Sequence, residues 1–228
     1  MYRNQRGQKV NLCGGTLVSH QHVLTAAHCD DERFGFIMSS VILGHVDLST
    51  RVTLPGVEVT IDKIISHPGY AQDPVAVNDI AMVKLTAPVL FTDMIRPICV
   101  FQAEDLGRDL DGEFSELLVA GWGRTERARS SPLLQFTELH QVNNDECDQD
   151  YGVTGIRIRD TQVCARGENE TDSCSGDSGG PLMRHVVGDR WYLAGVVSFG
   201  TNECNSVLPG VYTNIPSYYD WILETLKL

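Results

Sequence analysis

The chain lacks the features that mark several common functional classes. It has no run of about 18 consecutive apolar residues, so we expect no transmembrane helix. It has no excess of basic residues: 18 lysines and arginines stand against 30 aspartates and glutamates, and the net charge of −12 repels phosphate backbones. No internal repeat is present, and the histidine spacing is not that of a zinc site. These absences argue against a nucleic-acid-binding protein and a membrane-spanning protein.

The first residues, from Met1 onward, also lack the apolar stretch of a secretory signal. Yet seven cysteines in 228 residues favour an oxidising compartment. We therefore expect a secreted, extracellular protein whose true N-terminus is missing from this sequence. Asn169 begins an Asn-Glu-Thr triplet that matches a glycosylation acceptor, but such triplets are common by chance and add little support.

Short β-type runs separated by Gly, Pro, Asn and Asp clusters recur along the whole chain, a pattern typical of a sandwich or barrel. An acidic stretch at residues 101–115 divides the chain almost in half, and it is interpreted either as a linker between two β halves or as a surface loop within one domain. The strands are expected at residues 15–19, 56–66, 79–85, 117–122, 135–142, 191–199 and 210–214.

One helix is expected at the C-terminus, over residues 217–227. Pro216 opens it, Ser217 is a suitable capping residue, and Asp220 falls in the favourable first turn. The apolar stripe that begins at Tyr218 and Trp221 recurs at helical spacing, and we interpret it as packing surface.

The run Asp-Ser-Cys-Ser-Gly-Asp-Ser-Gly-Gly-Pro at residues 172–181 places Ser178 among small residues whose backbone N–H groups can converge on one point. Serine needs a base to accept its proton, and histidine suits that task. His28, in Leu-Thr-Ala-Ala-His-Cys, is the candidate base. Asp79, at the head of an apolar strand, is the candidate partner of the imidazole, although a turn residue that merely begins a strand would look similar. The remaining histidines are expected in solvated or packing positions: His20, His22, His45, His67, His140 and His185.

The order His28, Asp79, Ser178, with these flanking residues, resembles the chymotrypsin-like (trypsin-type) serine proteases over nearly the whole chain. The resemblance implies an all-β fold of two packed six-stranded antiparallel Greek-key β-barrels with a C-terminal α-helix. Barrel one would span about residues 10–100 and barrel two about residues 116–215 of a single protease domain, 1–228. Ser178 would be the nucleophile, His28 the general base and acid, and Asp79 the orienting group.

The same resemblance implies further site residues. The backbone N–H groups of Gly176 and Ser178 would form the oxyanion hole. Asp172 would lie at the floor of the specificity pocket and select Arg or Lys before the scissile bond, although an exposed loop acid beside Glu168 and Glu170 is the alternative. Ser198, Gly200 and Gly210 would line the substrate site, with Phe199 where trypsins usually carry Trp.

Six of the cysteines alone allow fifteen connectivities. The resemblance implies Cys13–Cys29, Cys147–Cys164 and Cys174–Cys204, each contributing about 3 kcal/mol on the loop-entropy model. Cys99 is left over, either free or paired with an N-terminal regulatory segment. Leu117 and Arg184 replace a further disulfide of many relatives, which resembles the clotting and clip-domain cascade proteases of arthropods.

Two departures from the family pattern alter the expectations. His45 replaces the expected acid of the trypsin calcium loop after Leu43 and Gly44, so we expect no metal and no cofactor. Twelve residues precede Cys13, and the family's Ile-Val-Gly-Gly start is absent. The resemblance implies that Asp177 pairs with that freed amino group, so we expect the domain to be N-terminally incomplete, zymogen-like at Asp177 and weakly active or inactive as it stands.

The sequence therefore predicts a secreted trypsin-like endopeptidase that cleaves after Arg or Lys through an acyl-enzyme, in a clotting or immune cascade. Its partners would be protein substrates, serine protease inhibitors and a regulatory segment bound through Cys99. The alternatives are a non-catalytic protease homologue that acts as a binding or cofactor module, which the intact triad argues against, and a digestive or venom trypsin.

Overall fold

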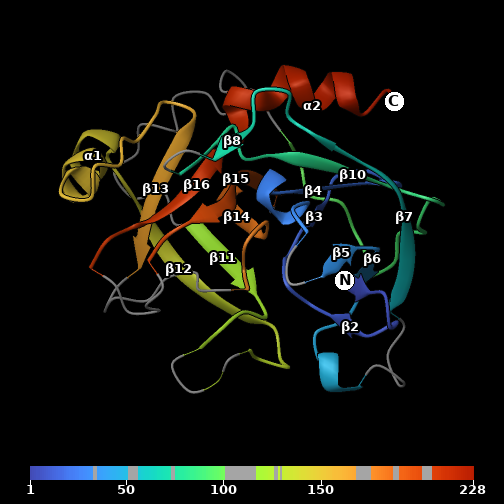
Figure 1. Ribbon diagram of the computed structural model, residues 1–228. Helices are drawn as coiled ribbons and strands as arrows, with labels where there is room; N and C mark the ends of the chain where they lie inside the picture. The colour runs from blue at the N-terminus through green and yellow to red at the C-terminus, as the bar shows by residue number, and fades with distance from the viewer. Residues whose placement is uncertain are drawn as a thin grey trace.

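The computed structural model is mostly β and consists of two packed halves with a helix at the C-terminus (Figure 1). It describes residues 1–32, 35–50, 56–72, 75–100, 117–125, 128, 130–167, 176–186, 190–201 and 207–228. The expected linker, residues 101–115, lies outside the described residues.

The second half is a closed antiparallel barrel with the strand order β11-β12-β13-β16-β15-β14. Its interior is filled by apolar side chains from every strand, including Leu117, Leu139, Leu182 and Tyr212, all at most 1% exposed. Closure leaves no unpaired edge strand, so the barrel is a rigid support for the loops at its ends. The strands are β11 (Leu117–Gly121), β12 (Gln135–Val142), β13 (Gln162–Gly167), β14 (Pro181–Val186), β15 (Arg190–Phe199) and β16 (Gly210–Asn214).

The first half is a five-stranded sheet with the order β3-β4-β10-β7-β6, flanked by a three-stranded sheet with the order β2-β1-β5. Its central strand β10 is buried at four of five positions because it pairs with β4 on one side and β7 on the other. The strands are β1 (Tyr2–Asn4), β2 (Lys9–Val10), β3 (Thr16–Leu17), β4 (His22–Thr25), β5 (Phe36–Met38), β6 (Ser40–Leu43), β7 (Val57–Ser66) and β10 (Ala81–Leu85), and a separate pair consists of β8 (Ala71–Gln72) and β9 (Ala76–Val77).

The prediction of an all-β protein with two β halves and a C-terminal helix is confirmed: the second half is a closed six-stranded barrel, and the first half is a curled half-barrel. The chain changes sheets at Ser39, since β5 pairs with β1 whereas β6 pairs with β7. The N–H of Ser39 donates to the carbonyl of Met1, and its carbonyl accepts from Ile61. Among the described residues, the short strands β1 and β2 form no ladder with β3, and the result is a curled half-barrel.

The helical segments depart from the sequence expectations at two points. The C-terminal segment begins as a 3₁₀ helix, η5 (Ile215–Tyr218), and continues as α2 (Tyr219–Thr225), so the expected cap at Ser217 is wrong and no side chain caps either start. A second helix, α1 (Asn144–Gly152), was not expected. Its start carried a signal, because Asn143 accepts a hydrogen bond from the N–H of Asp145 at 2.8 Å.

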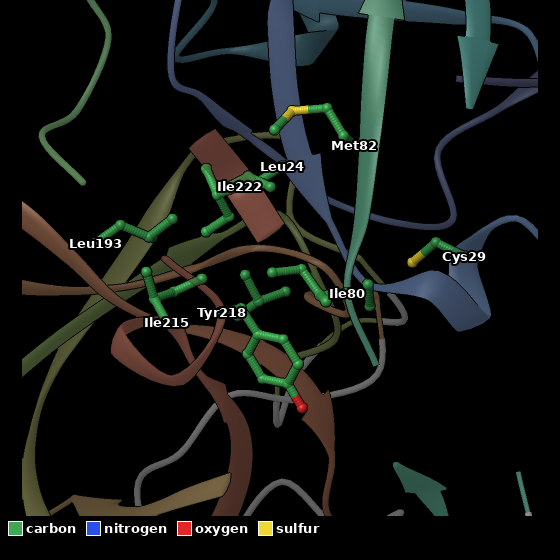
Figure 2. Packing of buried hydrophobic residues seen from close by; sticks show 10 residues of the cluster. Leu24, Cys29, Ile80, Met82, Leu193, Ile215, Tyr218 and Ile222 are labelled. Carbon is green, nitrogen blue, oxygen red and sulfur yellow. The ribbon is translucent and has the colours of Figure 1, made fainter. Parts of the chain in front are cut away.

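The two halves meet in one apolar cluster (Figure 2). The first half contributes residues that include Leu24, Cys29 and Ile80, and the second half and the C-terminal helices contribute others that include Leu193 and Ile222, all fully buried. Each of the leucine and isoleucine side chains contributes about 1.5–3 kcal/mol on burial. The cluster therefore fixes the two halves relative to each other, and it includes Cys29 from the 3₁₀ turn η1 (Ala27–Cys29).

His22, in β4, predicts a specific loss of stability in acid. The side chain is 9% exposed, its Nδ1 bonds to the hydroxyl of Ser19 at 2.8 Å, and its Nε2 is buried with no hydrogen-bond partner. Burial lowers the pKa of His22, and the positive charges of Lys84 and Lys63 lower it further. The unfolded chain therefore protonates His22 more readily than the folded protein does. The contribution of neutral His22 to the free energy of unfolding is complete above the unfolded pKa of about 6.5, and it is lost as the pH falls below that value.

We expect the free energy of unfolding to fall between about pH 7.5 and pH 5.5, and His22→Gln to reduce that fall. One proton sets an upper limit of about 1.4 kcal/mol per pH unit. Urea unfolding at both pH values measures the difference, with His140→Gln, at an exposed position on β12, as the control. Equal pH dependence in wild type and His22→Gln would contradict the assignment.

Candidate active site

Asp79 lies at the centre of the candidate site, buried to 2% exposure between the two halves. Its Oδ1 accepts a hydrogen bond from the backbone N–H of His28 at 2.9 Å, and its Oδ2 lies 2.7 Å from His28 Nδ1. The hydroxyl of Ser198, from β15 in the other half, donates to the same Oδ2 at 2.5 Å. Both carboxylate oxygens are therefore engaged, as a buried charge requires.

His28 lies in the turn η1 and is 5% exposed. Small residues precede it, and the Cys13–Cys29 disulfide ties the turn to the segment before β3. The hydroxyl of Tyr2 donates to the carbonyl of Cys29 at 2.6 Å and braces the turn from β1. A neutral ring that donates from Nδ1 to Asp79 presents Nε2 as an acceptor, which is the state a general base needs.

The segment of Ser178 packs directly against the segment that carries Cys13. The N–H of Gly14 donates to the carbonyl of Ser178 at 2.8 Å. A Cβ added at Gly14 would lie 3.0 Å from the Cα of Gly180, so the two backbones approach too closely for side chains. Gly176 and Gly179, at φ of +102° and +77°, shape the loop on both sides of the serine. Ser178 and His28 therefore lie on adjoining segments although 150 positions separate them in the sequence.

Asp177 points away from this loop toward a Gly-Trp-Gly turn after β11. The N–H of Gly123 donates to Asp177 Oδ1 at 2.8 Å. A Cβ at Gly121 would lie 1.9 Å from Oδ1, and one at Gly123 would lie 2.6 Å from the carboxylate. Only glycine fits at either position. This pair of glycines was not predicted from the sequence, although Gly-Trp-Gly at the end of an apolar strand is a visible signal.

The residues expected to line the substrate site are partly described. A Cβ at Gly200 would lie 3.8 Å from the Cα of Gly210, so these two glycines face each other. The side chain of Ser198, which was also expected to line the substrate site, bonds to Asp79, and its contact with substrate stays a prediction. Phe199 packs edge-on against Tyr151 at 6.0 Å between ring centroids. Asp172, Cys174, Cys204 and Asn169 lie outside the described residues.

The structure also places the other described cysteines and the two residues that stand where many relatives have a further disulfide. Cys147 and Cys164 are joined between α1 and β13, and Cys99 is an exposed free cysteine. Leu117 and Arg184 are register partners on β11 and β14, as expected of two positions that could share a disulfide. In the part of the chain that the structure describes, the side-chain donor atoms of Cys13, His28 and Cys29 lie within 4.8 Å of one another, but the disulfide occupies both sulfurs.

Two histidines outside the candidate site pack against aromatic rings. His20 stacks on Phe91 with centroids 3.7 Å apart, and His67 packs edge-on against Tyr218 at 5.3 Å. Burial lowers the pKa of His67.

None of the described helices is both long and apolar enough to cross a membrane.

The family model described as Trypsin matches residues 1–222. "Serine protease 7" of Drosophila melanogaster is 38% identical over 99% of this chain and 60% of its own length. "CLIP domain-containing serine protease B4" of Anopheles gambiae is 38% identical over 99% of the chain and 65% of its own length. "Phenoloxidase-activating factor 1" of Holotrichia diomphalia is 34% identical over 99% of the chain and 65% of its own length.

This chain thus spans less than two thirds of the length of these relatives. The family match covers both the half-barrel that carries His28 and Asp79 and the closed barrel that carries Ser198. The chain belongs to the trypsin family of serine proteases, and among its relatives are insect CLIP-domain and phenoloxidase-activating proteases.

Proposed function

We propose that the protein is a secreted serine endopeptidase that cleaves after Arg or Lys, with Ser178, His28 and Asp79 as its catalytic triad. The observation that carries the proposal is the buried Asp79 carboxylate, bonded at once to the N–H and the Nδ1 of His28. Such an arrangement holds an imidazole in one tautomer and stabilises it when it gains a proton. A purely structural histidine needs neither.

The proposed reaction has two half-steps of the same form. Ser178 Oγ attacks the scissile carbonyl carbon while His28 Nε2 takes its proton, and Asp79 stabilises the imidazolium. The backbone N–H groups of Gly176 and Ser178 stabilise the oxyanion. The intermediate expels the amine, which receives the proton from His28. Water then attacks the acyl-enzyme in the same way, and the acid product leaves with Ser178 regenerated.

Substrate choice is assigned to the loop segments around the site. Asp172 would bind a substrate guanidinium or ammonium group through charge-assisted hydrogen bonds. The facing glycines Gly200 and Gly210 support this assignment, since they leave room for a long side chain.

A place in a proteolytic cascade is supported by the names of the relatives, which include a phenoloxidase-activating factor and CLIP-domain proteases. The exposed Cys99 would pair with a regulatory segment, and protease inhibitors would act on the same cleft as substrates.

The first test asks whether Ser178 is a nucleophile. In the full-length activated protein, we expect stoichiometric labelling of Ser178 by a serine-directed phosphonate, detected by mass spectrometry, and hydrolysis of arginyl peptide substrates. Ser178→Ala should abolish labelling and lower kcat by about 10⁴-fold or more, because the covalent step is lost. Ser217→Ala, at an exposed position in η5, is the control. A folded, activated protein that neither labels nor hydrolyses would instead be a non-catalytic homologue.

The second test concerns specificity. Asp172→Ser should lower kcat/KM for arginyl substrates by about 30-fold or more, because a cation would be left without its partner in the pocket. Glu170→Gln, two residues away, removes a neighbouring acid and should have little effect. Kinetics on matched Arg, Lys and Leu peptides measure the preference. Equal behaviour of the two variants would reduce Asp172 to an exposed loop acid.

The third test concerns the support of the oxyanion hole. Gly123→Ala places a Cβ 2.6 Å from the Asp177 carboxylate, so we expect the serine loop to shift and kcat to fall by about 10²-fold, a loss typical of one missing oxyanion donor. Gly152→Ala is the matched control, since a Cβ there meets nothing within 4 Å. Steady-state kinetics should separate the two variants, and equal activity would refute the role of Asp177.

A further inference from the structure

The turn that carries Asp79 has an unusual backbone. Among the described residues, Asn78 is the one non-glycine residue in the left-handed region, at φ of +50°. Asparagine visits this region more readily than most residues, but the conformation still has to be held by its surroundings. Its carbonyl accepts from the N–H of Ile80 at 2.9 Å, so the chain folds tightly around Asp79. The direction of the carboxylate therefore depends on what holds Asn78.

The side-chain amide of Asn78 is held at both ends. Its Nδ2 donates to the carbonyl of Gly69 at 2.7 Å, which anchors it within the first half of the molecule. Its Oδ1 accepts a hydrogen bond from the hydroxyl of Tyr218 at 2.9 Å. Tyr218 is 140 residues away in the sequence and belongs to η5. The second bond therefore links the turn to the C-terminal segment.

Tyr218 is itself firmly placed. It is 4% exposed, and its ring lies beside Ile80 in the cluster between the halves, with the hydroxyl oxygen pointing out of the apolar side chains (Figure 2). His67 packs edge-on against the same ring, and the N–H of His67 donates to the carbonyl of Ile80 at 2.9 Å. The ring has little room to move, so its hydroxyl is a fixed donor.

The electrostatics keep that donor protonated. Burial raises the pKa of Tyr218, a hydrogen bond with Thr161 opposes the rise, and the negative charge of Asp79 adds to it. A second hydroxyl from the same stretch of chain, that of Thr213 in β16, donates to the backbone carbonyl of Asp79 at 2.7 Å. The turn is thus held by two hydroxyls from the second half of the chain.

We propose that Tyr218 is a positioning residue for catalysis: its hydroxyl holds Asn78 in the left-handed conformation that aims the Asp79 carboxylate at His28. The inference rests on the proposed function, because it assigns a further residue to the same triad. It makes the C-terminal segment part of the catalytic apparatus although Tyr218 touches no reacting group.

The test removes one oxygen atom. Tyr218→Phe should lower kcat by about 3- to 10-fold, the size of one lost hydrogen bond, with KM for a peptide substrate unchanged. The acidic limb of the kcat/KM profile should move to lower pH, because a misdirected carboxylate stabilises the His28 imidazolium less. Asn78→Gly keeps the backbone conformation but deletes the amide, and combining it with Tyr218→Phe should add no further loss.

Two controls separate positioning from general stability. Tyr219→Phe removes the hydroxyl of the next residue, at the start of α2. It is a matched control because the hydrogen bond to Asn78 comes from Tyr218. Thr225→Val deletes a buried hydroxyl that donates to the Trp221 carbonyl at 2.7 Å in the same helix, and should lower the melting temperature without the shift in the pH profile. If Thr225→Val reproduces the kinetic effects of Tyr218→Phe, the hydroxyl of Tyr218 is merely structural and the proposal fails.

A readout that needs no turnover keeps this proposal separate from the proposed function. The proton between His28 Nδ1 and Asp79 gives a far-downfield ¹H NMR resonance when the hydrogen bond is short. Tyr218→Phe should shift or broaden it, whereas Tyr219→Phe should leave it in place. An unchanged resonance overturns the positioning role even if the enzyme is active, and a changed one supports it even if the wild type proves to be non-catalytic.

Discussion

The whole arrangement depends on one buried carboxylate. Asp79 is 2% exposed, and a charge in that position is tolerated only if its oxygens are fully bonded. His28 satisfies it twice from the half-barrel, and Ser198 satisfies it once from the closed barrel. The hydrogen bonds that stabilise the buried charge also hold the imidazole in place. Stability and chemistry therefore impose the same geometry, which neither half could provide alone.

The apolar cluster between the halves holds them in the relative position that the contacts of Asp79 require. Cys29 directly follows His28, and Ile80 directly follows Asp79. Both of these side chains pack in the cluster and are fully buried. A relative shift of the halves would disturb the cluster and the hydrogen bonds of Asp79 together. Close-packed interiors resist such shifts because lost contacts are not replaced. Close packing also involves the backbone near Ser178 and Asp177, because the glycines there lie so near their neighbours that a side chain would not fit.

The sequence predicted the fold class and the family, and it identified the segments that meet at the candidate site. His28, Asp79 and Ser178 stand in short, recognisable contexts, and the structure brings their segments together. The half-barrel form of the first half was not predictable from local pattern, because it depends on ladders between short strands such as β1, β2, β3 and β4, which have two to four residues each. Helix α1 was not predicted because its sequence is polar and only Cys147 and Tyr151 of its residues are buried. The supporting contacts of Ser198, Thr213 and Tyr218 lie over a hundred positions from the Asn78–Asp79 turn they hold, beyond the reach of any local signal.

The amino-acid sequence by itself determined the β-rich class, the acidic net charge, the candidate nucleophile with its base and acid, and the family resemblance, since all of these reside in composition or in short runs of residues. Only the tertiary structure decided which groups surround Asp79, that Ser198 bonds to the carboxylate, and that Asp177 lies against Gly123. The physical reason is that hydrogen bonds and close backbone contacts act over about 3 Å in space. Their partners are chosen by how the two halves pack, and not by distance along the chain.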